Sequence, residues 1–323
     1  MTEFLIRRIG QSLLVLFFVS VITFGIIHAA PGGPVTVFIR PNQSPETVKQ
    51  QMHLLGLDKP VPVQYLEWLK RTLTGDLGTT FKSGRPVGDL LWPSLKNTLV
   101  LMSVAWGLVL LIAIPWGIYN STRQYGFSDN LSAAIGYAGF SMPTFWFGIL
   151  LQLLFSLKLG WLPLAGLHDM NKQGDVLDLL RHMVLPVSVL VIINLAQYLK
   201  YARSSMLEVL GQDYVRTARA KGVSERSVIF RHALRNAMIP IITIIGLDLP
   251  IIVVGATLTE TVFNWPGMGR LFVDMAVARE YSVLMAIVML TAVVVVLGNL
   301  LADILYAVVD PRVKLSGKGV TSA

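Results

Sequence analysis

Six long apolar runs, separated by polar segments, set the pattern of this chain. They cover residues 9–30, 95–119, 131–157, 183–199, 239–262 and 283–309. Each run is about long enough for a helix to cross a membrane, because a bilayer core of roughly 30 Å takes about 20 apolar residues. The pattern therefore predicts an all-α membrane protein with about six transmembrane helices.

The first run also fits a cleaved signal peptide, because Arg7 and Arg8 precede it and the small residues Ala29 and Ala30 end it. The apolar region of a signal peptide, however, is only about 7–15 residues long. This run is longer and continues into a segment of proline and glycine at 31–34. A retained membrane anchor is therefore the preferred interpretation.

A long polar segment after the first run has its apolar residues at helical spacing in two stretches, 45–55 and 62–73. Both stretches begin with proline, as helices often do. We expect a small folded cap here. The predicted organisation is a tail and first helix in 1–30, a cap in 31–94, a five-helix core in 95–310 and a tail in 311–323.

Residues 211–240, between the fourth and fifth runs, form a basic island. Its acidic residues are Asp213 and Glu225, and its Arg and Lys residues are Arg216, Arg219, Lys221, Arg226, Arg231 and Arg235. A cationic segment between two spans stays on the cytoplasmic side of a membrane. An even number of spans then puts both chain ends on that side, where two further basic pairs agree: Arg7 with Arg8, and Arg312 with Lys314.

Two short helices are predicted within the basic island. Asp213 is placed to N-cap a helix over 214–221, and Gly222 can end that helix in the left-handed conformation. Ser224 is placed to cap a second helix, which enters the fifth run. The surrounding loop, 203–238, is therefore expected to be a structured surface that contacts a partner.

Composition supports a membrane protein: 54% of the residues are hydrophobic, 14% are charged and the mean hydropathy is +0.62. The net charge of +8 comes largely from the basic island and the chain ends. It therefore indicates orientation in a membrane and not nucleic-acid binding. The chain has no cysteine, which excludes disulfides and thiolate metal sites.

Polar residues within the runs are functional candidates, because burying them in a membrane is costly. They are Asn194, Gln197, Asp248, Glu260 and Asp303. Asp248 lies closest to mid-span and is a candidate for a translocation pathway. Glu260 and Asp303 lie near predicted span ends, where solvation at the interface is the simpler explanation. The two amides fit hydrogen bonds between helices at least as well as contact with a substrate.

Catalytic motifs are absent from the sequence. It contains no G-x-x-x-x-G-K-[ST] phosphate loop, no H-E-x-x-H metal pair and no G-x-S-x-G elbow. Ligand spacing is also missing among the histidines, which are His28, His53, His168, His182 and His232. We therefore expect no catalytic residue, no metal site and no ATP hydrolysis by this chain alone.

Several segments together resemble the membrane permease subunits of ATP-binding-cassette importers. In that family a cytoplasmic loop of pattern E-A-A-x-x-x-G docks on the ATPase. In this chain Arg216-Thr217-Ala218 aligns with E-A-A and Gly222 with the glycine, so the glutamate and the first alanine of the pattern are absent. The form of the loop found here is similar to that of the dipeptide/oligopeptide branch, and within that branch to the first of the two paired permeases. The agreeing segments are Asp213-Tyr-Val-Arg-Thr-Ala-Arg-Ala-Lys-Gly222, Phe230-Arg-His-Ala-Leu-Arg-Asn-Ala-Met-Ile-Pro240, Phe4-Leu-Ile-Arg-Arg-Ile9, Gly75-Asp-Leu-Gly78, Glu260-Thr-Val-Phe-Asn-Trp-Pro-Gly-Met-Gly269 and Asp303-Ile-Leu-Tyr-Ala-Val-Val-Asp-Pro-Arg312.

The resemblance implies a type I importer permease fold in a bacterial inner membrane, with both termini cytoplasmic. It implies a second homologous permease, two cytoplasmic ATPase subunits, an extracytoplasmic binding protein and a peptide substrate as partners. ATP and magnesium would bind to the ATPase subunits, and this chain itself would bind no cofactor. The two permeases would together enclose the pathway, and the docked loops would transmit the motion of the ATPases.

The resemblance and the pattern give three groups of candidate residues. For ATPase coupling they are Arg216, Thr217, Ala218, Arg219, Ala220, Gly222, Val223 and Ser224. For the pathway they are Asp248, Glu260 and Asn194. For an external gate or contact with the binding protein they are Gly75, Asp76, Gly78, Trp265, Pro266 and Gly267.

Two points about these groups stay open. Ala218 and Ala220 are expected to pack closely in the ATPase groove, whereas Arg216 and Arg219 fit either pairing with acidic groove residues or simple solvation. The turn at 265–269 fits either a re-entrant gate or an interfacial turn with Trp265 facing the membrane boundary.

Other functions remain open as well. The same machinery imports nickel, metal chelates or glutathione in related systems. A secondary transporter with a proton relay through Asp248, Glu260 and Asp303 is a rival of another class, and a membrane scaffold without transport is a second. The sequence leaves open the exact substrate and whether the ATPases form a homodimer or a heterodimer.

Overall fold

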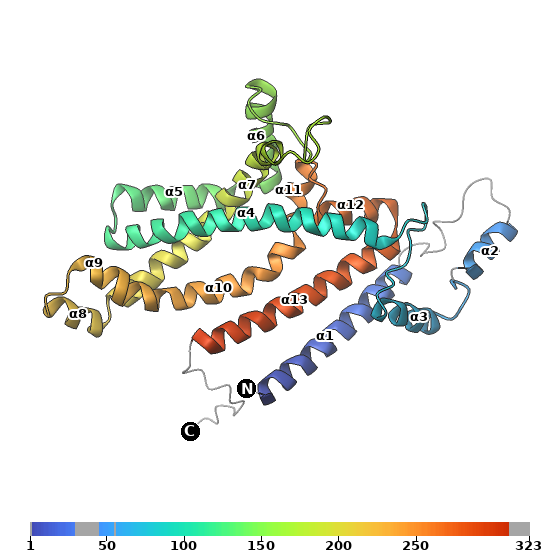
Figure 1. Ribbon diagram of the computed structural model, residues 1–323, viewed down its shortest axis with the longest axis horizontal. Coiled ribbons are helices and arrows are strands. Elements are labelled where there is room, and N and C mark those ends of the chain that lie inside the picture. The colour runs from blue at the N-terminus through green and yellow to red at the C-terminus, as the bar shows by residue number, and fades with distance from the viewer. Residues whose placement is uncertain (1, 30–44, 55, 310–323) are drawn as a thin grey trace.

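The computed structural model describes residues 2–29, 45–54 and 56–309, and within these ranges the elements are helical (Figure 1). These described ranges also contain an isolated antiparallel β-bridge between Thr79 and Pro86. The helices are α1 (Thr2–Ala29), α2 (Pro45–Leu54), α3 (Val61–Leu73), α4 (Val87–Thr122), α5 (Phe127–Ser141), α6 (Thr144–Leu151), α7 (Val176–Leu210), α8 (Asp213–Ala220), α9 (Glu225–Ser227), α10 (Leu234–Val254), α11 (Thr257–Val262), α12 (Met268–Ala278) and α13 (Tyr281–Val309). Two π-helical segments, Gln152–Lys158 and Val228–Ala233, extend α6 and join α9 to α10.

The predicted spans are confirmed as helices of membrane-crossing length. Five stretches are long and apolar enough, in α1, α4, α7, the α9–α10 stretch and α13. The third apolar run is a bent pair, α5 with α6, whose two parts meet at 103°. Pro143 explains the bend, because proline disfavours helical backbone at the residue before it, and Met142 is extended. Counting the pair as one span gives six.

The fifth apolar run differs from the single helix predicted over 239–262. Helix α10 ends at Val254, Gly255 follows with φ +80°, and α11 is a separate short helix. Glycine adopts this backbone conformation without strain, so the chain can change direction within an apolar run. The helix α12, between α11 and α13, was not predicted at all.

The core lies between α4 and α7, which pack along each other for much of their length (Figure 1). Small residues permit the close approach: a Cβ on Gly117 of α4 would lie 2.6 Å from the Cβ of Ala202 on α7. Close packing of this kind is the usual source of association between helices in a membrane. Helices α10 and α13 pack against each other, and α1 flanks α13. Many apolar side chains on the other side of α1 are exposed, including Leu13, Phe17 and Ile22.

The predicted cap helices are confirmed as α2 and α3, although residues 30–44 lie outside the described ranges. Two hydrogen bonds connect α3 to α1: Tyr65 Oη lies 2.8 Å from Ser20 Oγ, and Gln64 Oε1 lies 3.1 Å from His28 Nε2. The segment after α3 is held by Glu280, whose carboxylate accepts hydrogen bonds from the backbone N–H groups of residues 81 and 82 at 2.6 and 3.0 Å. The cap is thereby fixed to both α1 and the start of α13.

Candidate functional site

Helices α8 and α9 lie at one end of the bundle, away from α11 and α12 (Figure 1); we call this the α8 end. Helix α8 is amphipathic: Val215 and Ala218 are buried and pack against Val228, whereas most other α8 side chains are exposed. Val228 begins the π-helical segment that leads into α10. Apolar packing therefore connects α8 to the start of the α10 span.

The end of α8 confirms the prediction for Gly222, which has φ +77°. Its N–H donates to Arg219 O at 2.9 Å, and the N–H of Val223 donates to Ala218 O at 3.2 Å. This is the Schellman arrangement, which satisfies carbonyl groups that the helix end would otherwise leave unpaired. A Cβ on Gly222 would meet nothing within 4 Å, so backbone conformation and not space selects glycine here.

Both predicted caps need correction. Gln212 is the N-cap residue of α8, and Asp213 is the first helical residue with a side chain that is 97% exposed. Its carboxylate lies 3.5 Å from Arg216 and near the helix N-terminus, where negative charge is favourable. Ser224 does precede α9, but its hydroxyl makes no capping hydrogen bond.

The charges at this end are partly paired within the chain. Arg219 donates two hydrogen bonds to Glu225, at 2.6 and 3.1 Å. These hydrogen bonds, together with the negative charge of Glu225, raise the pKa of the Arg219 guanidinium. Arg216, Lys221 and Arg226 are exposed. Within the chain Arg219 is thus paired with Glu225, and its pairing with acidic groove residues of a partner stays a prediction.

The two alanines of α8 differ from each other. Ala218 is buried against the chain's own residues, one helical turn from Val215, so it does not offer a surface to a partner. Ala220 is exposed, as are Thr217 and Ser224. The expected close packing of Ala218 in a partner groove is thus wrong for this arrangement. The exposed surface includes Arg216, Thr217, Arg219, Ala220, Lys221, Gly222, Ser224 and Arg226, together with Asp213, Tyr214 and Glu225.

Asn194, a pathway candidate, lines a cavity of about 290 Å³ together with Trp106 and residues of α11. Its amide nitrogen donates to the Leu190 carbonyl of its own helix at 2.7 Å. Asp248 does not belong to that lining. Its carboxylate accepts a 2.5 Å hydrogen bond from the Tyr198 hydroxyl, across the α7–α10 contact.

Glu260 is completely buried, which contradicts both its placement on a pathway and its solvation at the membrane interface. Its carboxyl oxygens accept hydrogen bonds from Thr98 Oγ1 at 2.7 Å, Gly269 N at 2.8 Å and Arg270 N at 3.1 Å. Thr98 in turn accepts from Met268 N at 2.7 Å. This set of contacts, which we call the Glu260 network, joins α11, the first turn of α12 and α4. A proton relay through Glu260 finds no support in this geometry.

The turn that follows α11 is also buried. Trp265 is 1% exposed, and its indole N–H donates to Asn97 O at 3.0 Å. The amide of Asn97 donates in return to Pro266 O at 3.0 Å. Trp265 is therefore not a residue facing the membrane boundary, because its ring packs into the core between α4 and α7. Whether this turn acts as a gate stays a prediction.

Asp76, Leu77 and Gly78 of the 75–78 turn line a cavity of about 260 Å³ between the cap and the bundle. The Asp76 carboxylate accepts from Gly78 N at 2.9 Å, which fixes the turn. Phe24 of α1, Trp68 of α3 and Tyr281 of α13 complete the cavity wall with other residues. The sequence motif is thus placed beside the first helix, where it remains a candidate for contact with a binding protein.

Sequence reasoning missed one internal ion pair near the α8 end. Arg203 donates to both carboxylate oxygens of Asp129, at 2.6 and 2.8 Å, and so connects α7 to α5. Asp129 and Arg203 lie near the ends of two different apolar runs, and the sequence pattern does not indicate that they pair. The side chain of Asp303, and both Arg312 and Lys314, lie outside what the structure describes.

Comparisons with known proteins agree over nearly the whole chain. The family model "Binding-protein-dependent transport system inner membrane component" matches residues 113–315, and the N-terminal model of the same kind of membrane component matches residues 1–103. The oligopeptide transport system permease protein AppB of Bacillus subtilis is 44% identical over 97% of this chain and 100% of AppB. The dipeptide transport system permease protein DppB of Escherichia coli is 39% identical over 97% of this chain and 99% of DppB.

A solved structure supports the fold. A chain of the MetNI methionine ABC transporter, in an inward-facing conformation, matches with a TM-score of 0.53 and 17% identity. The match covers 68% of this chain and 96% of the MetNI chain. The match shows that the two chains share the fold of the helical bundle.

Proposed function

We propose that this chain, which belongs to the family of inner membrane components of binding-protein-dependent transport systems, forms half of the pathway of a peptide importer. The observation that carries this proposal is the near full-length identity to AppB and DppB, whose names state oligopeptide and dipeptide transport. Dipeptides or oligopeptides are therefore the proposed substrates. Nickel, metal chelates and glutathione are the alternatives to be tested.

The proposed partners are a second permease, two ATPase subunits that bind ATP and magnesium, and an extracytoplasmic binding protein. This chain would carry no catalytic residue. In this assembly the α8 end faces the cytoplasm together with both chain termini, because the basic island prefers that side of the membrane. Asn194, in the cavity beside α11, is the pathway residue that the geometry favours, since its amide is placed at a cavity wall.

The α8 end is the proposed contact with the ATPase. Its exposed basic residues Arg216, Lys221 and Arg226 suit an acidic groove. Motion of a docked α8 would pass to two spans at once. Helix α8 continues from α7 after two residues, and its buried Val215 packs against Val228 at the start of the α10 stretch. Closure of the ATPases would then tilt α7 and α10 together.

Purification of the tagged chain with its co-expressed partners tests the proposal. Gly222→Asp places a side chain at a left-handed residue within the proposed dock, and we expect loss of the ATPase subunits. Gly160→Asp is a matched control, because Gly160 also has a positive φ, of 65°, and open space for a Cβ, but lies outside α8. The control should retain the ATPases.

Uptake into proteoliposomes then identifies the substrate. We expect ATP-dependent uptake of a dipeptide or oligopeptide in the presence of the binding protein. ATP-dependent uptake of nickel or glutathione in place of peptides would replace the substrate and keep the importer. Uptake by the lone chain along an ion gradient would contradict the importer and support a secondary transporter.

A further inference from the structure

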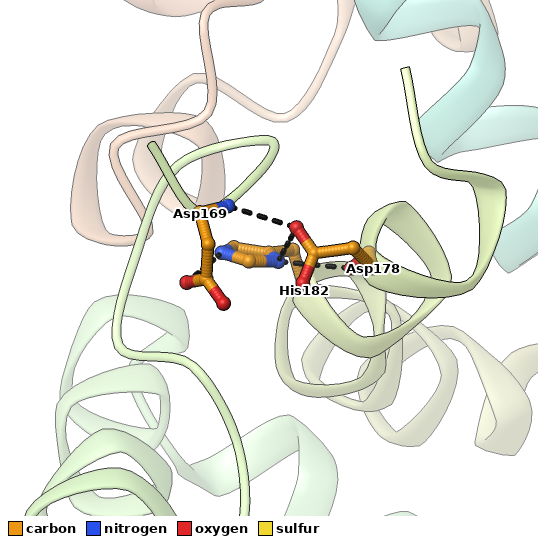
Figure 2. A group of neighbouring side chains, drawn as sticks. All are labelled: Asp169, Asp178 and His182. Atoms are coloured by element: carbon orange, nitrogen blue, oxygen red, sulfur yellow. Dashed lines mark hydrogen bonds and ion pairs between the residues drawn. The ribbon is translucent and has the colours of Figure 1, made fainter. Parts of the chain in front are cut away.

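A cluster of polar side chains lies where the loop over residues 159–175 meets the first turns of α7. Asp169 comes from the loop, and Asp178 and His182 come from α7 one turn apart. Figure 2 shows the imidazole of His182 between the two carboxyl groups. One potential ligand atom from each residue lies within 4.8 Å of the others. His168 adds a second imidazole, with Nδ1 at 3.6 Å from Asp178 Oδ2.

The hydrogen bonds of the cluster orient His182 as metal-binding histidines are oriented. Its Nδ1 lies 2.9 Å from Asp178 O, and a carbonyl oxygen only accepts, so Nδ1 carries the hydrogen. In the neutral ring, Nε2 then presents a lone pair, and this atom points at Asp169 Oδ1 from 3.8 Å. Two electron-rich atoms that face each other at this distance leave a place for a cation between them.

Asp178 gives an independent indication. Its side chain is 2% exposed, and among the described residues Oδ1 accepts no hydrogen bond, while the Lys172 ammonium lies 3.6 Å away. Its other oxygen accepts from Asp169 N at 2.8 Å, which fixes the carboxyl group. A buried carboxylate oxygen that accepts no hydrogen bond has lost its water without gaining an equivalent donor, and a bound cation would supply the missing contact. Nδ1 of His168 is likewise buried without a hydrogen-bond partner in the described part of the chain.

The charge balance of the cluster also leaves room for more positive charge. Lys172 is the nearby cation, with Nζ 3.2 Å from Asp169 Oδ2 and 3.6 Å from Asp178 Oδ1. One ammonium group does not neutralise two carboxylates. Lys172 is also about half exposed, with 47% of its side chain accessible, so it can turn away into solvent. A divalent cation in place of the Lys172 ammonium would balance the negative charge of both carboxylates.

We propose that Asp169, Asp178 and His182 bind a divalent transition-metal ion. Imidazole nitrogen combined with carboxylate oxygen suits zinc and related ions, whereas calcium and magnesium prefer oxygen ligands alone. The hydrogen bonds from His182 Nδ1 to Asp178 O, and from Asp169 N to Asp178 Oδ2, are the supporting contacts that such sites use. The bound ion joins the 159–175 loop to α7.

This site was not expected from the sequence, where the histidines show no ligand spacing among themselves. The signal is visible only when carboxylates are counted with them. Asp178 and His182 are spaced i, i+4 and therefore share one face of a helix, and His168 and Asp169 are adjacent in the preceding loop. The fold brings the two pairs together.

Zinc binding by the full-length chain tests the proposal directly. The chain is purified with its co-expressed partners through a histidine-free affinity tag, washed with a chelator and dialysed against zinc or magnesium. We expect one zinc ion retained per copy of this chain, measured by mass spectrometry of the metal content. We also expect zinc, and not magnesium, to raise the midpoint of thermal unfolding. Absence of zinc retention, or equal retention of magnesium, overturns the proposal.

Three variants locate the ion. Asp169→Asn and His182→Gln should each weaken zinc binding by about tenfold or more; Asp169 is 55% exposed, so its variant should fold even where the His182 variant does not. His53→Gln is the matched control, because His53 forms an exposed histidine–aspartate pair with Asp58 at 2.6 Å on α2. Binding by this variant should be unchanged. Equal zinc binding by the parent, Asp169→Asn and His182→Gln would place the ion elsewhere and contradict the site.

Lys172→Met separates a metal site from a simple ion-pair cluster. Removing the competing ammonium should tighten zinc binding, since the two carboxylates then have no other cation. If the cluster instead exists to pair with Lys172, the variant should lower the unfolding midpoint and leave zinc affinity unchanged or weaker. That second result would overturn the assignment.

Discussion

The two ends of the helical bundle use charge in opposite ways. At the α8 end, Arg219 and Glu225 pair in the open, with side chains 42% and 57% exposed. At the other end, Glu260 is completely buried and its partners are the Thr98 hydroxyl and backbone N–H groups. Exposed charges can be exchanged for those of a partner at little cost, whereas a buried carboxyl group with three hydrogen bonds cannot. The first arrangement suits a docking surface, and the second keeps the shape of the α11–α12 turn.

The largest effect should follow removal of the buried group. Glu260→Ala leaves the N–H groups of Gly269 and Arg270 without an acceptor and opens a cavity beside Thr98, so we expect a loss of about 3 kcal/mol or more in unfolding free energy. The thermal unfolding midpoint of the purified chain in detergent measures it. Glu225→Ala, at the α8 end, is the control and should cost no more than about 1 kcal/mol. Similar losses for both variants would remove the contrast between the two ends.

A smaller loss is expected from Gly267→Ala. A Cβ at this position would lie 2.5 Å from the Glu260 carboxyl group and from Thr98 Oγ1, so either the turn or the network must shift. Overpacking of this kind costs about 1–3 kcal/mol. Gly107→Ala in α4 is a matched control, because a Cβ there meets nothing within 4 Å. The control should be neutral or slightly stabilising, as expected for alanine in a helix; a loss equal to that of Gly267→Ala would contradict the steric explanation.

Local chemistry explains which features were predictable from the sequence. The spans were visible because bilayer thickness fixes the length of an apolar helix, and the Gly222 turn was visible because a left-handed residue after a helix is typically glycine. Glu260 begins the motif at 260–269 that the sequence singled out, but its role in holding the α11–α12 turn depends on a hydrogen bond from Thr98, which lies 162 positions earlier. No pattern within a single run indicates such a partner.

Bends within the apolar runs mark a second limit. Pro143 and Gly255 each interrupt a run that is long enough for one span. Elsewhere α4 and α7 continue through Pro115 and Pro186. The outcome depends on whether neighbouring helices support the broken backbone, which is a property of packing and not of the residue alone.

Gly222→Ala should have an intermediate effect, confined to α8. Alanine in the left-handed conformation costs about 1–2 kcal/mol, which falls on the Schellman end of the helix and not on the core. We expect faster hydrogen exchange of the α8 backbone amides with little change in the global midpoint. Gly211→Ala, just before α8, is the control, because Gly211 has a negative φ of −79°. Equal acceleration of exchange in both variants would mean that the left-handed residue is not what holds α8.

The smallest effect should come from Arg219→Ala, and its salt dependence makes it the sharpest probe of the comparison. The Arg219–Glu225 pair is exposed, so its loss should change unfolding free energy by about 0–1 kcal/mol, and less at high salt because ions screen the pair. The matched variant at the buried end is Thr98→Val, which removes a hydrogen bond to Glu260 without changing net charge. Its cost should not respond to salt. Unfolding midpoints at low and high ionic strength compare the two, and a salt-independent loss for Arg219→Ala would mean that this pair, too, is part of the rigid frame and not an exchangeable surface charge.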